Sequence, residues 1–222
     1  MINHQHSVFD QSGYQVQYKF IEPHLLARYL GKRLSLLEIG SGSGELSIFI
    51  KKQLSDIKIN AQIFAIELNQ SLHQKLKDKG IKVVDPPPKL KTKFDLIILS
   101  HTLEHLFDPV AYLTKLTKLL KSHGVIYIDL FSIFNLHNDP GYKFNLQYFL
   151  PHFHLQTFNS LSLTNLCSLA RLQPLVITED IKALFYKPHK PFHLSDYSLK
   201  TNAQLVKNYL KQFQLRQDIW RS

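Results

Sequence analysis

Two histidines and a glutamate lie in the short segment from His101 to His105, directly after an apolar run. Imidazole and carboxylate groups are the usual general bases near neutral pH. The candidate bases in this chain are His101, Glu104, His105 and His154. If the segment is helical, His101 and His105, four residues apart, share one face. The order His-Thr-Leu-Glu-His departs from the H-E-x-x-H zinc motif, in which glutamate follows the first histidine, so no metal site is predicted.

Three glycines alternate with serines in Gly40-Ser41-Gly42-Ser43-Gly44. Glycine adopts positive φ without strain and lets a ligand approach the backbone closely. Such a turn after the first strand of an α/β sheet is a common site for adenosine-containing cofactors. The pattern is not the dinucleotide fingerprint G-x-G-x-x-G, and Glu45 at the helix start would repel a pyrophosphate. A cationic ligand without phosphate, such as S-adenosylmethionine, suits these electrostatics.

Glu67 ends the next apolar stretch, at the distance from the glycine turn where an acidic residue accepts hydrogen bonds from both ribose hydroxyls of an adenosine. Its negative charge would disfavour a 2′-phosphate. The alternative role for Glu67 is to cap the helix that follows. The ribose role is favoured because the glycine turn and Glu67 occur together.

From residue 34 to residue 130, apolar runs alternate with segments whose apolar residues recur at helical spacing. The strands and helices predicted from this pattern must position the candidate site residues. Expected strands are 34–39, 59–66, 81–84, 94–99 and 125–130. Expected helices are 21–30, with Pro23 near its start, 45–54, 70–79, 108–120, 160–172 and 196–220. Two further strands, 175–178 and 183–186, are expected to pair antiparallel around Glu179 and Asp180. Strict alternation with short connections predicts a parallel sheet with helices on both faces.

Several segments resemble class I S-adenosylmethionine-dependent methyltransferases. Leu36–Gly44 resembles their motif I, and Phe64–Glu67 resembles their acidic second-strand motif. Phe94–Pro109 is similar to the F-D-x-I…L-E-H…D-P motif of a subfamily that methylates sugars, quinone precursors and natural products. The segments 119–124 and 154–161 continue the match. The resemblance covers about residues 14–186 and implies a Rossmann-like, seven-stranded α/β sheet, mostly parallel with an antiparallel final strand.

The resemblance also implies which residues contact the cofactor: Glu38, Gly40, Ser41, Gly42, Gly44, Glu67, Leu68, Asp85, Ser100 and His101. Glu38 would face the amino-acid end of the cofactor, and Leu68 would pack on the adenine. Two departures from the family concern Asp85, which three prolines follow at once, and the end of the fifth strand, which is Asp129-Leu130-Phe131-Ser132 instead of a Pro-Asn-like turn. In the family, the Glu104–His105 pair has the alternative role of anchoring the following loop.

The interpretation for domains is one class I methyltransferase domain at residues 1–190, with a cap helix region at 1–33 and a substrate-side lid at 131–158. Residues 191–222 are expected to form a C-terminal amphipathic helix that packs on the domain or, alternatively, makes a dimer contact. A monomer or a homodimer is expected. The lid is inferred from its length and its content of Asn, His, Phe and Tyr.

The composition restricts the partners, the disulfide bonds and the membrane segments that this chain is expected to have. Its formal charge is +10, but the basic residues are scattered, which favours a solvated basic surface over an anionic substrate or nucleic acid. The single cysteine, Cys167, excludes an intrachain disulfide and is expected to be buried. No apolar run approaches the roughly 20 residues of a membrane span, and the N-terminal residues lack signal-peptide features. A cytoplasmic protein without a membrane partner is expected.

The sequence therefore predicts an S-adenosylmethionine-dependent methyltransferase that acts on a small-molecule acceptor. The acceptor class would be a sugar, a quinone-like compound or a secondary metabolite, methylated on O, N or C. Two alternatives remain open. One is an RNA or protein methyltransferase, suggested by the positive charge, and the other is a non-catalytic cofactor-binding module of the same fold.

Overall fold

The structure is a computed structural model of the 222-residue chain, and it describes residues 11–135, 154–189 and 203–211. The chain divides into two compact units, 1–98 and 99–222, with the boundary inside strand β4 (Phe94–Ser100). The lid predicted at 131–158 falls largely on residues outside the described ranges. Of the helix predicted at 196–220, residues 203–211 are described and are helical. The predicted domain boundaries stay predictions.

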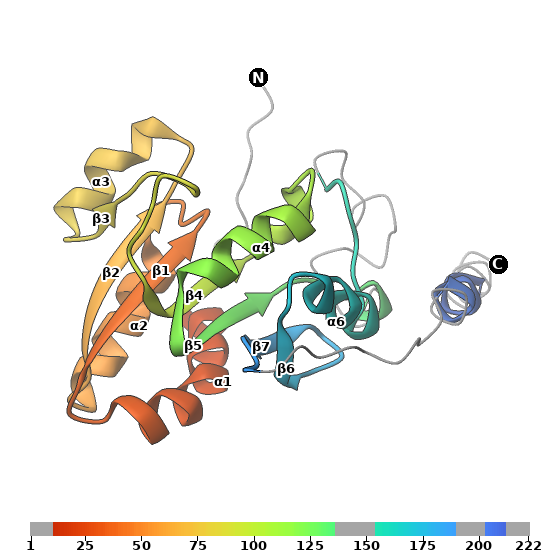
Figure 1. Ribbon diagram of the computed structural model, residues 1–222, viewed down its shortest axis with the longest axis horizontal. Helices are drawn as coiled ribbons and strands as arrows, with labels where there is room; N and C mark the ends of the chain where they lie inside the picture. The colour runs from red at the N-terminus through yellow and green to blue at the C-terminus, as the bar shows by residue number, and fades with distance from the viewer. Residues whose placement is uncertain (1–10, 136–153, 190–202, 212–222) are drawn as a thin grey trace. The chain divides into compact units, whose positions relative to one another are not determined.

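The first unit is built from alternating helices and parallel strands, as the sequence predicts. Its elements before β4 are α1 (Gln11–Tyr29), β1 (Arg33–Ile39), α2 (Glu45–Asp56), β2 (Asn60–Ile66), η1 (Gln70–Leu72), α3 (His73–Asp78) and β3 (Lys82–Val83). β2 pairs in parallel with β1 on one side and with β3 on the other. Helix α2 lies along β2 (Figure 1). This arrangement brings the residues after β1 and β2 to the same end of the strands.

Helix α1 is longer than predicted, because it begins at Gln11 and contains Pro23. The prediction began the helix at Ile21, with Pro23 in the first turn where proline is tolerated, and this start was wrong. Tyr18, Ile21 and Leu25 are buried at spacings of three and four residues. This apolar stripe runs across Pro23, so packing continues the helix on both sides of the residue.

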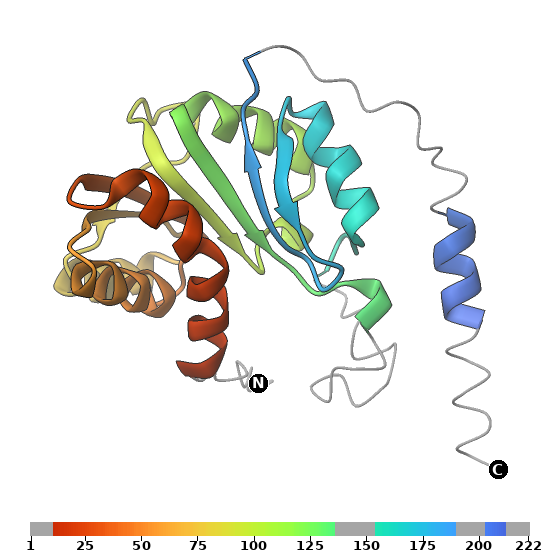
Figure 2. The same cartoon turned by 90° about the horizontal axis from the view of Figure 1, so that it is seen from below.

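The second unit contains the end of β4 and the elements that follow it. These are η2 (Leu103–His105), α4 (Pro109–Leu119), β5 (Leu120–Asp129), η3 (Ile133–Asn135), α6 (Ser160–Leu169), β6 (Gln173–Ile177) and β7 (Lys182–Tyr186). β7 runs antiparallel to both β5 and β6, which confirms the predicted antiparallel pair. α6 contacts α4 and β6 (Figure 2). β5 begins five residues before the predicted 125, and α6 ends three residues before the predicted 172.

The seven strands have the order β3-β2-β1-β4-β5-β7-β6. The fold class is therefore as predicted: a Rossmann-like sheet that is mostly parallel, with an antiparallel final strand. β6 is an edge strand, which is where a proline such as Pro174 is tolerated because one side of the strand needs no ladder donor.

Polar residues within the core are held by specific partners. Asp95 of β4 is buried, and its carboxylate accepts hydrogen bonds from the backbone N–H of Ser35, at 2.8 Å, and from the Ser35 hydroxyl. Asp95 of the F-D-x-I motif thus joins β4 to β1. Cys167 is fully buried and burial raises the pKa of its thiol, which confirms the predicted core position.

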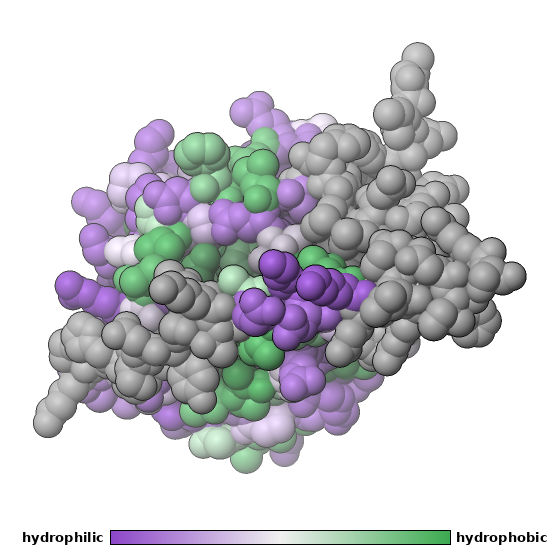
Figure 3. All heavy atoms as spheres, turned by 90° about the vertical axis from the view of Figure 1, so that its right-hand side faces the viewer, coloured by the Kyte–Doolittle hydropathy of each residue, from purple (hydrophilic) through white to green (hydrophobic). Residues whose placement is uncertain are grey.

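The surface mixes polar and apolar side chains. On the face shown in Figure 3, hydrophilic and hydrophobic residues of the described part are interspersed. Among the described residues, no helix is both long and apolar enough to cross a membrane. A cytoplasmic location and the oligomeric state stay predictions.

Candidate functional site

The glycine turn after β1 uses all three glycines in the left-handed region, with φ of 68°, 53° and 78° at Gly40, Gly42 and Gly44. A Cβ added at Gly44 would lie 2.5 Å from the Ile81 side chain and 2.8 Å from that of Leu76. Gly44 therefore allows close packing against the α3–β3 segment. A Cβ added at Gly42 would meet nothing within 4 Å. The backbone of Gly42 is consequently the part of the turn that is open to a ligand.

Glu38 lies near the end of β1 and is almost fully buried. The Ser47 hydroxyl at the start of α2 donates a hydrogen bond to it. Burial raises the pKa of Glu38 to about 7, the hydrogen bonds from Ser47 oppose this, and the charge of Glu67 raises the pKa further. A buried carboxylate of this kind gains from a cationic partner, such as the ammonium group of an amino acid.

Glu67 follows β2 and joins it to the glycine turn. Its Oε2 accepts a hydrogen bond from the N–H of Gly42 at 2.8 Å, and its Oε1 accepts one from the N–H of Asn69 at 2.8 Å. The next side chain, Leu68, is 86% exposed. Asp85, after β3, is also exposed. The structure thus brings Glu67 beside the open glycine, with an exposed apolar side chain at the next position.

Glu45 is less repulsive to an anion than the sequence analysis assumed. Its carboxylate forms an ion pair with Lys79, which lowers its pKa, and the Lys79 ammonium also donates to the carbonyl of Ser43 at 2.9 Å. The positive charge of Lys79 lies 34 residues along the chain, so the sequence did not reveal it. The charge of Glu45 is therefore weaker evidence against a pyrophosphate ligand. The main evidence against it is the glycine spacing, which differs from G-x-G-x-x-G.

In the second unit, His101 follows β4 in the left-handed region, with a φ of 49° that is uncommon for a residue other than glycine. Its N–H donates to the carbonyl of Asp129 at 2.9 Å. Its ring lies 4.5 Å from that of Phe131, and its Nδ1 lies 3.6 Å from Glu104 Oε1. A non-glycine residue held in this conformation is typical of functional sites.

The expectation that His101 and His105 share a helix face is wrong. The only helical turn in this segment, η2, begins at Leu103, so His101 lies outside it. His105 instead lies beside His154, with their ring centroids 4.9 Å apart. Two of the contacts among the four candidate bases are therefore His101 with Glu104 and His105 with His154.

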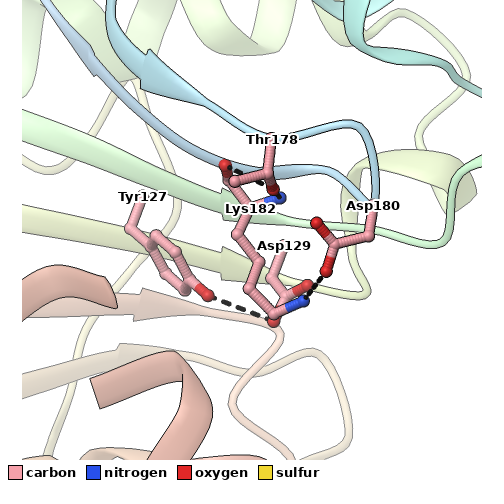
Figure 4. A network of polar contacts seen from close by, with 5 residues as sticks. All are labelled: Tyr127, Asp129, Thr178, Asp180 and Lys182. Carbon is pink, nitrogen blue, oxygen red and sulfur yellow. Dashed lines mark hydrogen bonds and ion pairs between the residues drawn. The ribbon is translucent and has the colours of Figure 1, made fainter. Parts of the chain in front are cut away.

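Asp129 at the end of β5 was not selected as a site residue from the sequence. It is buried, and it accepts a hydrogen bond from the Tyr127 hydroxyl at 3.1 Å (Figure 4). Burial raises the pKa of Asp129, while electrostatic interactions with the neighbouring His101 and Lys182 oppose that shift. In the same network Lys182 pairs with Asp180. An acid at the carboxyl end of the fifth strand was the available signal in the sequence. The residues that act on its pKa, His101 and Lys182, come from the segment after β4 and from β7.

A cavity of about 740 Å³ also lies within the second unit. Its walls are largely apolar, with polar and basic side chains among them, and the residues are Ile133, Thr157, Phe158, Asn159, Ser162, Ala203, Val206, Lys207, Leu210 and Lys211. Small-molecule sites have volumes of roughly 300–1,000 Å³ and mostly apolar walls. The sequence indicated an amphipathic helix over 196–220, of which 203–211 are described, but not that residues of this helix line a cavity.

The chain is similar to known methyltransferases in sequence. Methyltransferase str3 of Strobilurus tenacellus is 29% identical over 133 residues, which cover 56% of this chain and 47% of that protein. Methyltransferase str2 of the same organism is 31% identical over 115 residues, which cover 50% of this chain and 40% of that protein. The chain thus spans about half the length, or less, of these curated relatives.

The fold is similar to that of the plantazolicin methyltransferase BpumL, solved in complex with a pentazolic desmethylPZN analog and SAH. The TM-score is 0.61 at 16% identity, covering 92% of this chain and 80% of that one. A model of the methyltransferase domain family matches residues 13–174. Because this match extends over most of the chain, the chain belongs to the methyltransferase domain family.

Proposed function

We propose that this protein binds S-adenosylmethionine and transfers its methyl group to a small-molecule acceptor. The observation that carries the proposal is the pair of carboxylates, Glu38 and Glu67, on the strands that flank the open, left-handed Gly42. S-adenosylmethionine carries a sulfonium and an ammonium, so the two carboxylates complement its charge. The relatives named as methyltransferases support the same reaction.

Within this proposal each residue of the first unit has a defined task. Glu38 faces the cofactor's amino-acid end, where burial of the carboxylate strengthens its interaction with a cation. Glu67 accepts hydrogen bonds from the ribose hydroxyls, and Leu68 covers one face of the adenine. The backbone of Gly40, Ser41 and Gly42 lies against the ligand. Asp85 is the weakest member of the set, because it is exposed and no described contact directs it.

The acceptor is proposed to be a small organic molecule with a nucleophilic O, N or C atom. The apolar cavity of the second unit suits such a molecule by its volume, and its lysines suit a polar or acidic substituent. The solved plantazolicin methyltransferase, in complex with a pentazolic desmethylPZN analog and SAH, supports an acceptor of this class.

The cofactor supplies an electrophilic methyl group, and the protein aligns the acceptor with it. The acceptor atom attacks the methyl carbon while the carbon–sulfur bond breaks, and the electron pair of that bond stays on sulfur. An O–H or N–H acceptor must also lose a proton. Within the second unit, the candidate groups lie at the end of β4 (Ser100), in the segment that follows it (His101, Glu104, His105) and beside His105 (His154). His101 and His154 are the proposed bases.

Isothermal titration of the protein with S-adenosylmethionine tests the cofactor assignment. We expect saturable binding that Glu67→Ala weakens about tenfold or more, because hydrogen bonds to a charged group contribute roughly 1.5–3 kcal/mol. Glu179→Ala is the matched control, since Glu179 is an exposed glutamate outside the first unit. Absence of binding at about millimolar cofactor, which corresponds to roughly −4 kcal/mol, would contradict the proposal.

RNA is the second candidate acceptor, favoured by the formal charge of +10. Phosphate contacts make nucleic-acid affinity fall steeply with salt. Retention of RNA that survives about 200 mM salt would favour RNA as the acceptor. Retention lost between about 50 and 200 mM salt would indicate only the general charge of a basic surface.

A further inference from the structure

Glu104, His105 and His154 each offer one side-chain ligand atom, and these atoms all lie within 4.8 Å of one another. We propose that these three residues, here called the Glu-His-His cluster, bind one divalent transition-metal ion. The sequence predicts no metal here, because the H-E-x-x-H motif with which this segment was compared lies on a single helix. The cluster instead draws its third member from a different segment of the chain.

The backbone holds the two segments of the cluster together. The N–H groups of Leu155 and Gln156 both donate to the carbonyl of Glu104, at 2.9 and 3.3 Å. The Gln156 side chain donates to the carbonyl of Leu106 at 3.1 Å. His154 is therefore placed beside η2 by hydrogen bonds on both sides of the Glu104–His105 pair.

Glu104 supplies an independent observation that points to a ligand. Its side chain is buried, with the residue 5% exposed, and Oε2 has no hydrogen-bond partner among the described residues. His101 Nδ1 lies 3.6 Å from the other oxygen, Oε1, which is beyond hydrogen-bond length. Burying an unsatisfied carboxylate oxygen costs on the order of 1–3 kcal/mol or more. A cation at this oxygen would remove that cost.

A small cavity borders the same carboxylate. Its volume is about 10 Å³, and its lining residues are Glu104, Leu130, Phe131, His154, Gln156, Thr157 and Phe158. This volume is on the order of one water molecule. The unpartnered oxygen and His154 therefore border a space in which an ion or one of its water ligands fits.

The donor set selects the class of metal. Two imidazole nitrogens and one carboxylate oxygen suit Zn²⁺, Fe²⁺, Co²⁺ or Mn²⁺. Mg²⁺ and Ca²⁺ prefer oxygen ligands and are disfavoured. Metal–nitrogen and metal–oxygen distances near 2.1 Å require the three ligand atoms to move closer together than their present separation. Three protein ligands leave coordination positions open for water or for an oxygen of a bound molecule.

A role for the metal in methyl transfer rests on the proposed function. An acceptor hydroxyl bound at an open position would have its pKa lowered by the cation. The proton then leaves to a base or to solvent, and the acceptor oxygen attacks the methyl carbon as the carbon–sulfur bond breaks. The metal site itself does not depend on this role, because its ligands belong to one unit of the protein.

Titration of metal-free protein with Co²⁺, followed by visible absorption, tests the site directly. We expect one equivalent to bind, with the absorption of a nitrogen-ligated Co²⁺ centre. Glu104→Gln and His154→Ala should each weaken binding about tenfold or more. His105→Ala is a third variant that should still fold, since His105 is exposed. His123→Ala is the control, because His123 is an exposed histidine of β5 outside the cluster.

Two outcomes would overturn the inference: no stoichiometric Co²⁺ binding, or binding that the His123 variant weakens as much as the cluster variants. Circular dichroism confirms that each variant is folded before titration. S-adenosylmethionine titration of the same metal-free protein separates the two proposals. Cofactor binding without Co²⁺ binding contradicts only the metal site, and Co²⁺ binding without cofactor binding contradicts only the proposed function.

Discussion

Individual residues of the glycine turn have different tasks, and this difference can be measured. Gly42→Ala and Gly44→Ala both place a side chain at positive φ, which costs roughly 1–2 kcal/mol. Only Gly44→Ala also places a Cβ against Ile81 and Leu76. We expect Gly44→Ala to lower the free energy of unfolding by about 1–3 kcal/mol more than Gly42→Ala does. Urea denaturation of both variants gives this difference.

The same pair separates packing from binding. Gly42→Ala should weaken S-adenosylmethionine binding about tenfold or more, as the added methyl group occupies the open side of the turn. Equal destabilisation by the two substitutions, together with unchanged cofactor affinity for Gly42→Ala, would show that the open side of Gly42 does not face the ligand.

Glu38 should make the stability of the protein depend on pH. Its pKa is raised to about 7 in the folded protein, mainly by burial, so the folded state binds the proton more tightly than the unfolded state does. Stability contributed by the protonated carboxyl is therefore full below the unfolded pKa and is lost as pH rises from about 4.5 to about 7. The loss is on the order of 3 kcal/mol.

Glu38→Gln removes this titration while keeping a hydrogen-bond acceptor for Ser47. We expect the difference in unfolding free energy between Glu38→Gln and the unmodified protein to shift in favour of the variant between pH 5 and pH 7. Urea denaturation at the two pH values measures it. A difference that stays constant across this range would mean that Glu38 is not perturbed as described.

At the scale of elements, α6 depends on the cap at its N-terminus. The Asn159 side chain accepts a hydrogen bond from the N–H of Ser162 at 2.8 Å, and the Ser162 hydroxyl accepts one from the N–H of Asn159 at 2.9 Å. Asn159→Ala should lower stability by about 1 kcal/mol, because loss of such a cap leaves helix donors unsatisfied. Thermal denaturation measures this loss.

The cap belongs to the second unit, so Asn159→Ala should leave S-adenosylmethionine affinity unchanged under the proposed function. Ser168→Ala is the comparison, since the Ser168 hydroxyl lies at the other end of α6 and donates only to the carbonyl of Asn165. If Ser168→Ala destabilised the protein as much as Asn159→Ala does, the destabilisation by Asn159→Ala could not be attributed to loss of the N-terminal cap.

At the scale of the whole molecule, the helix at 203–211 is held by a small apolar contact. Ile133 packs against Val206, Tyr209 and Leu210, and the Tyr209 ring lies 5.2 Å from that of Phe134. Few buried contacts mean that the helix can open without the unfolding of the sheet. Leu210→Ala should therefore speed amide hydrogen exchange in 203–211, with little change in the midpoint of global unfolding. If Leu210→Ala instead lowered the midpoint of global unfolding, the helix would unfold together with the sheet.

Much of the fold was predictable because its causes are local. Strands such as 94–99 are apolar throughout, and glycine or proline marks the ends of the helices, so the alternation along the chain leads directly to a mostly parallel sheet. The glycine turn and Glu67 were predictable for a related reason. The turn needs a backbone with positive φ, which its glycines adopt without strain, and Glu67 directly follows an apolar strand.

The tertiary structure decided the features that depend on residues far apart in the chain. Lys79 neutralises Glu45, β7 brings Lys182 to Asp129, and His154 reaches His105 across about fifty residues of chain. No sequence spacing predicts these pairs, because the order of the strands and the hydrogen bonds of the loops determine which residues meet. Composition and periodicity thus determined the sheet and the glycine turn, while long-range packing alone determined which charged side chains meet, since charge pairing depends on distance in space.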